Sequence, residues 1–224
     1  MIVLINILLL SSPRLAVRAM SVASSSSSSP SSLVGLHWFR KGLRLHDNPA
    51  LMESLSAHKV SKLFPVYILE PGLEKRDIGI NRYTHTLQTL EDLDSSLRRL
   101  GSRLFLLQGD TEEQLRKALL EWKVDVLSFE ADSEPSFKGM REAVDRMAME
   151  LGVKVVEKTS HTLYSPEEYI EQSQKKKISF NSYVTFCRLF LAMGTVRKPL
   201  PAPDHLPQVL LYYEPSQLLT GKTF

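Results

Sequence analysis

The sequence predicts an α/β protein, a Rossmann-like five-stranded parallel sheet with helices on both faces. Two observations predict it. Between positions 34 and 156, five short apolar runs alternate with longer segments whose apolar residues recur at helical spacing. The apolar runs are too short for helices and show little polar alternation, as expected of strands covered on both faces. Strands separated by helices pair in parallel through right-handed crossovers, which makes a doubly covered sheet the expected architecture.

The first strand is expected at 34–39, where an apolar run stops in a basic turn. Asp47 or Asn48 then lies where a side-chain oxygen can cap the start of a helix over 49–57. Pro49 suits the first helical position because that position needs no backbone N–H donor. The carboxyl end of this strand therefore leads into a helix, as at the ligand crevice of an open parallel sheet.

The remaining elements follow in order along the chain. Further strands are expected over 63–69, 103–108, 124–129 and 153–156. Between the second and third strands, leucines recur at three, four and seven residues in a long amphipathic helix that Gly101 ends. Asp110 begins the next helix as a cap, and the helix before the last strand ends at Gly152.

Composition narrows the classes of function. The chain has 224 residues, 43% of them hydrophobic, which is enough for one domain with a proper core and appendages. Its formal net charge of +3 permits nucleic-acid contact without arguing for it. The single cysteine, Cys187, excludes an internal disulfide, and no Cys or His cluster predicts a metal site. The sequence has no phosphate-binding glycine loop and no nucleophile motif, so we assign no catalytic residue.

Four segments differ in composition. We expect a disordered Ser-rich leader at 1–33, the α/β domain at 34–165, a helical and Pro-rich linker at 166–207 and an atypical tail at 208–224. The apolar start of the leader is shorter than the roughly 20 residues that span a bilayer, so no membrane helix is expected. We interpret the leader as a disordered extension, or as sequence ahead of a true start at Met20. Organelle transit and secretion are the alternatives.

Charged side chains follow two of the expected strands at the same edge of the sheet. Arg40 and Lys41 follow the first strand, and Asp132 and Glu134 follow the fourth. Because a crevice forms at the carboxyl ends of parallel strands, these four residues predict a polar cleft of mixed charge. The alternative is purely local, with Asp132 or Ser133 capping the helix that follows.

The stretch 37–51, HWFRKGLRLHDNPAL, resembles the opening of the cryptochrome/DNA photolyase family, in the animal cryptochrome and (6-4) photolyase branch. Further landmarks stand in family order: GINR at 79–82, LEDLD at 90–94, DSEP at 132–135 and SHTLY at 160–164. The chain departs from the family pattern at 83–86, at 174–177 and by one residue inserted before Phe137. The resemblance implies the N-terminal photolyase α/β domain, truncated before the FAD domain.

The resemblance also implies where cofactors belong. In the family, this edge of the N-terminal domain holds an antenna pigment, a folate or a deazaflavin, when one is used. Arg40, Lys41, Asp132 and Glu134 are therefore candidate residues of an antenna cleft. FAD is held in the family by a large C-terminal helical domain, and none of the matching positions exists in this sequence. We expect no FAD site here.

Two classes of function follow from the resemblance. The first is the antenna-type domain of a protein for blue-light-dependent DNA repair or for light and circadian signalling, with this chain itself catalytically inactive. The second is a truncated cryptochrome that acts as an interaction module in circadian transcriptional repression. The choice between a DNA photolyase, which is a lyase, and a non-enzymatic photoreceptor stays open, because the discriminating positions lie in the absent domain.

The partners implied by the resemblance are damaged DNA or clock transcription factors, in the nucleus and cytoplasm. Organelle transit by the leader is the alternative location. The basic residues at 175–177, with Arg188, Arg197 and Lys198, predict a solvated face of the linker; weak, salt-sensitive DNA contact is the alternative. No membrane partner and no metal are expected.

Overall fold

The computed structural model describes residues 32–70, 79–179 and 181–207, so the expected tail and all but the last two residues of the expected leader lie outside the described residues. Five strands form one sheet in the order β3-β2-β1-β4-β5, and every neighbouring pair is parallel. The strands are β1 (Val34–Phe39), β2 (Lys62–Leu69), β3 (Phe105–Gln108), β4 (Val126–Glu130) and β5 (Lys154–Lys158). The predicted five-stranded parallel sheet is confirmed.

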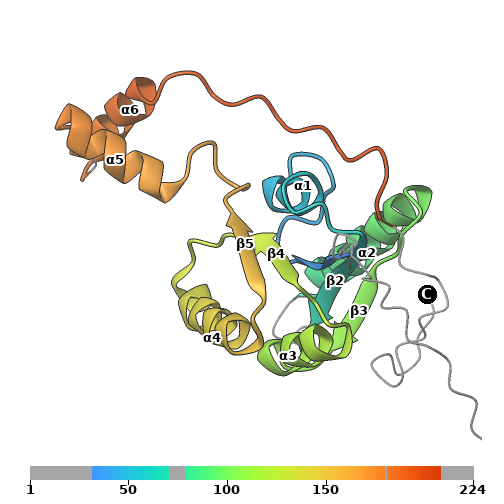
Figure 1. The fold of residues 1–224 in the computed structure, drawn as a ribbon. Helices are drawn as coiled ribbons and strands as arrows, with labels where there is room; N and C mark the ends of the chain where they lie inside the picture. The colour runs from blue at the N-terminus through green and yellow to red at the C-terminus, as the bar shows by residue number, and fades with distance from the viewer. Residues whose placement is uncertain (1–31, 71–78, 180, 208–224) are drawn as a thin grey trace, which may run out of the picture. The chain divides into compact units, whose positions relative to one another are not determined.

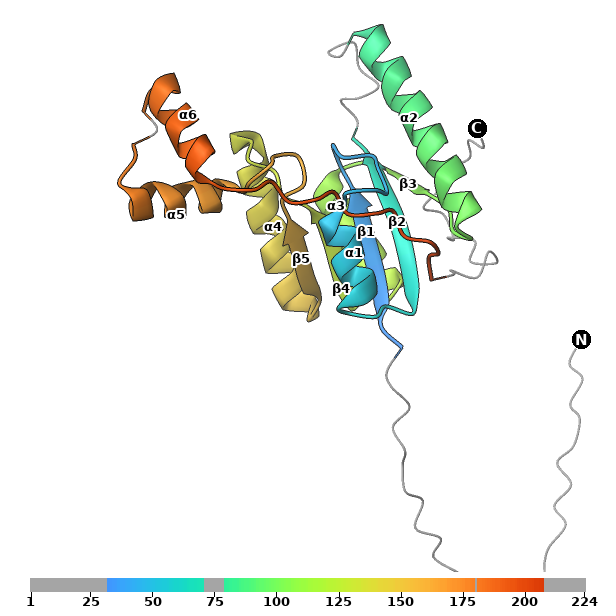
Figure 2. The same cartoon turned by 90° about the horizontal axis from the view of Figure 1, so that it is seen from above.

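Helices cover both faces of this sheet, as predicted. The helices are α1 (Pro49–Ser56), α2 (Ile80–Arg99), α3 (Thr111–Glu121), α4 (Pro135–Leu151), α5 (Pro166–Lys176) and α6 (Tyr183–Ala192). Buried side chains of α1 and α2 pack with the strands in one apolar cluster, and those of α3 and α4 pack in another. Figure 1 shows α1 and α2 above the strands and α3 and α4 below them, and Figure 2 shows α1 in front of the central strands.

Aromatic rings fill the core on the side of α3 and α4. Phe64 of β2 stacks on Trp122 with ring centroids 4.5 Å apart, and Phe105 of β3 lies 5.5 Å from the same indole. On the opposite face, Leu90 and Leu97 of α2 are buried against the sheet. The long helix predicted from leucine spacing is therefore confirmed, with its leucine face turned to the core.

Two helices begin at the caps that the sequence predicts. The Asn48 side-chain oxygen accepts the Leu51 amide at 3.1 Å, and the Asp110 carboxylate accepts the Glu113 amide at 3.0 Å. Gly152 ends α4 with a φ of 69°, a left-handed conformation that favours glycine. The turn after β1 is thus tied to α1 by its own amide side chain.

The start of α4 differs from the interpretation that Asp132 or Ser133 caps it, and that interpretation is wrong. The capping position is Glu134, and no side chain makes a capping hydrogen bond there. Asp132 Oδ1 accepts the Glu134 amide at 3.0 Å, outside the helix. The other carboxylate oxygen of Asp132 is held by Arg40 and Lys41. Asp132 therefore bonds across neighbouring strand ends rather than to α4.

Helices α5 and α6 pack against each other around Tyr164. The Tyr164 ring lies 5.8 Å from Tyr169 of α5 and 6.1 Å from Phe190 of α6, and its hydroxyl donates to the Gly194 carbonyl at 3.0 Å. The Pro-rich segment that follows α6 returns to the α/β domain, where Leu206 is buried in the cluster of α1 and α2. The domain boundaries expected from composition stay predictions.

Candidate functional site

The candidate site lies where the strand order of the sheet reverses. β1 and β4 are hydrogen-bonded neighbours, and the chain proceeds from β1 toward β2 and β3 on one side and from β4 toward β5 on the other. Open parallel sheets form their ligand crevice at such a point, beyond the carboxyl ends of the strands. Arg40 and Lys41 leave β1 there, and Asp132 and Glu134 leave β4 there.

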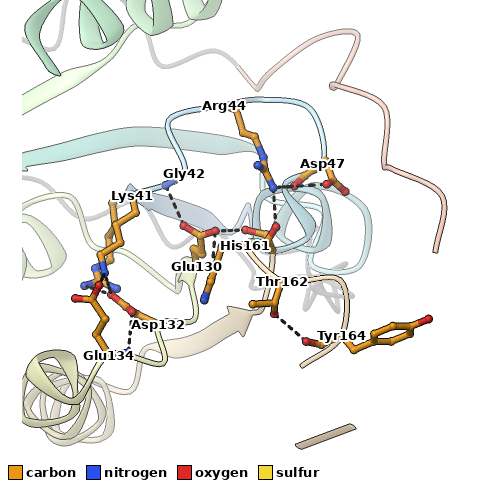
Figure 3. Close-up of polar contacts among 12 residues, drawn as sticks. Lys41, Gly42, Arg44, Asp47, Glu130, Asp132, Glu134, His161, Thr162 and Tyr164 are labelled. Atoms are coloured by element: carbon orange, nitrogen blue, oxygen red, sulfur yellow. Dashed lines mark hydrogen bonds and ion pairs between the residues drawn. The ribbon is translucent and has the colours of Figure 1, made fainter. Parts of the chain in front are cut away.

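These four side chains meet in one series of ion pairs. Asp132 Oδ2 lies 3.2 Å from the Arg40 guanidinium and 3.0 Å from Lys41 Nζ. Lys41 Nζ in turn lies 2.6 Å from Glu134 Oε1, and Figure 3 shows Lys41, Asp132 and Glu134 together. The Asp132 side chain is 6% exposed, whereas those of Lys41 and Glu134 are 53% and 60% exposed. The structure brings the four predicted residues together, and they form ion pairs with one another. Their role in holding a ligand stays a prediction.

Arg40 is also held by aromatic rings. Its guanidinium carbon lies 3.5 Å from the centroid of Phe137 and 5.1 Å from that of Trp38, within the range of cation–π attraction. Phe137 belongs to the first turn of α4 and is buried. Arg40 thus joins the end of β1 to the start of α4, and its positive charge is already balanced by Asp132 and the two ring faces.

These contacts set the ionisation of the cluster. Burial alone would raise the pKa of Asp132, but the Glu134 amide and the Lys41 ammonium outweigh it and hold that pKa below its usual value. Burial lowers the pKa of Arg40, against the opposing field of Asp132. Burial also disfavours the Lys41 charge, yet hydrogen bonds to Glu134 and Asp132 raise the pKa of Lys41 overall. Asp132 and Lys41 therefore stay charged in neutral solution.

Glu130, the last residue of β4, forms a second polar contact point that strand patterning did not assign. Its Oε2 accepts the Gly42 amide at 2.9 Å (Figure 3). Its Oε1 accepts the hydroxyl of Ser160. A Cβ at Gly42 would lie 2.8 Å from Glu130 Oε2, so a larger residue there would displace the Glu130 carboxylate. Arg44 adds a bond of 2.7 Å to the Ser160 carbonyl. Glu130 thus ties together the loops that follow β1 and β5.

His37, inside β1, forms a buried neutral network that periodicity also did not reveal. Its Nδ1 lies 2.8 Å from Ser128 Oγ on β4, and its Nε2 lies 3.1 Å from Asn48 Nδ2. Because the Asn48 amide donates, Nε2 accepts and Nδ1 carries the proton toward Ser128. Burial lowers the pKa of His37 to about 3, so the ring is neutral. The signal in the sequence was one histidine within an otherwise apolar strand.

A cavity of about 300 Å³ opens beside the ion pairs. It is lined by Ala131, Asp132, Ser133, Glu157, Thr159, His161, Pro166 and Glu167. Three carboxylates face this space, and neither Arg40 nor Lys41 is part of its lining. Within the described ranges, no group of three Cys, His, Asp or Glu side chains is arranged to hold a metal ion. In the same ranges, no helix is long and apolar enough to cross a bilayer.

The match to known proteins covers the sheet, its helices and the segment after α6. The family model described as DNA photolyase matches residues 35–204. The chain belongs to the DNA photolyase family. Cryptochrome-2 of Gallus gallus is 43% identical over 166 residues, which is 74% of this chain and 28% of that protein. The chain thus spans about a quarter of the length of this curated cryptochrome.

Solved structures of the photolyase family share the fold. A bacterial class III photolyase from Agrobacterium tumefaciens matches with a TM-score of 0.67 and 28% identity, over 83% of this chain and 37% of its own. An archaeal photolyase from Sulfolobus tokodaii, solved with two FAD molecules, matches with a TM-score of 0.58 and 23% identity, over 77% of this chain and 38% of its own. The match to the Agrobacterium photolyase supports membership of the family, whereas the match to the Sulfolobus photolyase supports the fold alone.

The cavity beside Asp132 in this photolyase-family domain does not fit the antenna pigment that the resemblance offers as a candidate ligand. A planar pigment needs mostly apolar or aromatic walls with a few polar groups that fix its orientation. The cavity beside Asp132 instead presents three carboxylates and no aromatic ring except the imidazole of His161. A carboxylate-bearing folate would meet like charge there, and the cations of Arg40 and Lys41 are already paired. We therefore derive no chemistry through an antenna.

Proposed function

We propose that this chain serves as the N-terminal α/β domain of a cryptochrome or photolyase, in blue-light-dependent DNA repair or in light and circadian signalling, and that the chain alone is photochemically inactive. The observation that carries the proposal is the extent of the match. Residues 35–204 match the family as one block, and the aligned part is 28% of Cryptochrome-2. We expect the longer relatives to bind FAD, and we do not expect residues 35–204 alone to do so.

Repair by the purified full chain tests this proposal. The chain is mixed with FAD and a duplex that carries a (6-4) photoproduct or a cyclobutane dimer, and is then illuminated with blue light. An intact photolyase in the same reaction is the positive control. We expect no repair and no flavin retained through gel filtration. Light-dependent repair, or a yellow protein with tightly held flavin, would overturn the proposed inactivity.

The absence of an antenna is the second part of the proposal. It is supported by the acidic lining of the cavity at Asp132, Glu157 and Glu167. Reconstitution of the purified chain with a reduced folate or a deazaflavin, followed by gel filtration, checks it. We expect no pigment absorbance in the near-ultraviolet or blue to travel with the protein. A stoichiometric pigment complex that is lost in Asp132→Ala would restore the antenna interpretation.

A second candidate function is protein interaction in circadian repression, with clock transcription factors as partners in the nucleus and cytoplasm. It is favoured because the relative with 43% identity is a cryptochrome. The start of α4 offers such a partner no apolar contact at Phe137, which is 4% exposed and covered by Arg40. A pull-down with this chain as bait and purified clock transcription factors as prey tests this function. Glu134→Arg, which reverses an exposed charge at the edge of the sheet, is the variant compared with the wild type. If the wild-type chain retains none of them, this function is discarded.

A further inference from the structure

Ser179 follows three consecutive lysines in the turn between α5 and α6. Lys175 and Lys176 lie in the last turn of α5, and Lys177 ends that helix in a left-handed conformation with a φ of 54°. All three lysines are exposed, and among the described residues none of them has an ion-pair partner. The chain departs from the family pattern at 174–177, so the family resemblance supplies no role for these lysines.

Lysines ahead of a serine form a pattern that protein kinases read. Kinases select substrates partly by charge, and those with acidic clefts favour cations ahead of the acceptor hydroxyl. In the part of the chain that the structure describes, Ser102 and Ser179 are the serines or threonines that stand three positions after a lysine or arginine. Arg99 holds that position ahead of Ser102, and Lys176 holds it ahead of Ser179. The sequence pattern alone therefore offers two candidate acceptors.

Burial separates these two serines. Ser102 is 5% exposed, and its amide donates to the Leu97 carbonyl at 3.0 Å, which holds it against the end of α2. Ser179 is exposed, and its hydroxyl oxygen accepts the Asn181 amide at the long distance of 3.4 Å. A kinase must reach both the acceptor hydroxyl and the residues before it. The fold therefore leaves Ser179 accessible and withholds Ser102.

The segment ahead of Ser179 is also one that opens at low cost. No residue of α5 is buried, and a helix end without buried apolar contacts opens locally far more readily than the core. Ile178 is tied back to Ser173 by two hydrogen bonds, one from its amide at 3.0 Å and one to its carbonyl at 2.7 Å. These two bonds, with the last turn of α5, are what the chain gives up when it extends in a kinase cleft.

We propose that Ser179 is a phosphorylation site for a protein kinase that recognises basic residues ahead of its acceptor. The co-reactant is ATP. A bond forms between Ser179 Oγ and the γ-phosphorus, the bond from that phosphorus to the bridging oxygen of the β-phosphate breaks, and ADP leaves. The hydroxyl proton passes to the carboxylate base of the kinase. The product carries a phosphate monoester three residues ahead of Ser182, the capping residue of α6.

The charges around Ser179 favour the phosphorylated product. A phosphate brings a charge of about −2, so segment 175–179 changes from +3 to about +1 instead of gaining unpaired negative charge. A negative charge is also favourable close to the N-terminus of a helix, which is where α6 begins. Phosphorylation therefore neutralises most of this basic turn, and any contact of the turn with nucleic-acid phosphates becomes weaker.

The first test locates the phosphate. The purified full chain is incubated with ATP and the catalytic subunit of cAMP-dependent protein kinase, which selects basic substrates, and its peptides are then mapped by tandem mass spectrometry. We expect phosphate on Ser179 and none on Ser102. Ser179→Ala should abolish the signal at this position, whereas Ser136→Ala, which removes an exposed hydroxyl on α4 without a basic residue three positions before it, should leave it unchanged. Absence of phosphate from Ser179 would overturn the proposal.

The second test asks whether the lysines direct the kinase. Lys176→Gln should lower the initial rate of phosphorylation at Ser179 at least about tenfold, because it removes the cation three positions ahead. Lys154→Gln is the matched control, since Lys154 is an exposed lysine on β5 outside this turn. Equal rates in the two variants would show that Ser179 reacts without recognition and would contradict the proposed site. Neither test involves light or flavin, so failure here is distinct from failure of the proposed function.

Discussion

Two polar clusters lie on the same pair of strands, and they differ in burial and in charge. The His37 network joins β1, β4 and the start of α1 inside the protein, and it is neutral. The Arg40 cluster joins the ends of β1 and β4 at the edge of the sheet, and it is charged and partly open to solvent. The first cluster is held by hydrogen bonds between uncharged groups, and the second by pairing of charges.

The difference shows how burial decides whether a polar group is neutral or is charged and paired with an opposite charge. A charged imidazole without a carboxylate partner would be very unfavourable inside the sheet, so His37 gives up its second proton. Arg40 cannot lose its proton in that way, and the structure instead supplies Asp132 and the Phe137 ring. The buried cluster should therefore dominate stability and its pH dependence, while the exposed end of the other should contribute little.

Removal of the His37 side chain tests this ranking most strongly. His37→Ala leaves a cavity in the sheet and leaves Ser128 and Asn48 without their shared partner. We expect the free energy of unfolding to fall by about 3–5 kcal/mol, as for other large-to-small changes of buried rings. Urea unfolding at pH 7, followed by circular dichroism, measures it. A loss below about 1 kcal/mol would show that the network is incidental.

Arg40→Ala is expected to have the next largest effect. It leaves Asp132, a side chain that is 6% exposed, without its guanidinium partner and removes the cation from the Phe137 face. We expect a loss of about 2–3 kcal/mol, less than for a fully buried pair because Lys41 stays in place. A double-mutant cycle with Asp132→Asn should show coupling above about 1 kcal/mol. Strictly additive losses of stability would mean that the ion pair between Arg40 and Asp132 is not the cause of the loss in Arg40→Ala.

The pH dependence of unfolding separates the two clusters directly. The pKa of His37 falls from 6.5 in the unfolded chain to about 3 in the fold, so the unfolded state binds the proton first as the pH drops. The fold is then destabilised across the window from about pH 6.5 to pH 3, by about 2 kcal/mol between pH 7 and pH 5. In His37→Gln, which keeps a neutral polar side chain, this part of the slope should vanish. Equal slopes in both proteins would contradict a neutral buried His37.

The sequence alone predicted the parts of this comparison that depend on chain pattern. The alternation of apolar runs and amphipathic segments predicted the sheet, and the crevice rule placed Arg40, Lys41, Asp132 and Glu134 at one edge, where the structure has them. What ligand, if any, these residues hold is still a prediction. Parallel pairing of strands that alternate with helices follows from topology rules that apply to many sequences, which is why this much was accessible.

Side-chain pairing was not predictable in the same way. The covering of Arg40 by Phe137 depends on the angle at which α4 leaves the sheet, and no spacing in the sequence encodes that angle. His37 stood within an apolar run as one polar residue, and its partners Ser128 and Asn48 lie far away in sequence or beyond a turn. The capping role suggested for Asp132 failed because α4 begins at Pro135, which makes Glu134 the capping position and leaves Asp132 bonded to the Glu134 amide ahead of the helix.

The smallest effect is expected at the exposed end of the Arg40 cluster. Lys41 Nζ and Glu134 Oε1 lie 2.6 Å apart, but both side chains are more than half exposed. Water therefore screens the attraction between them, and each side chain loses conformational freedom when the pair forms. Glu134→Gln should change the free energy of unfolding by less than about 0.5 kcal/mol, and added salt should erase even that difference. Urea unfolding at low and high salt measures both. A loss as large as that of Arg40→Ala would show that Glu134 is needed to keep Lys41 on Asp132, and the division between a structural inner end and a solvated outer end of the cluster would then be wrong.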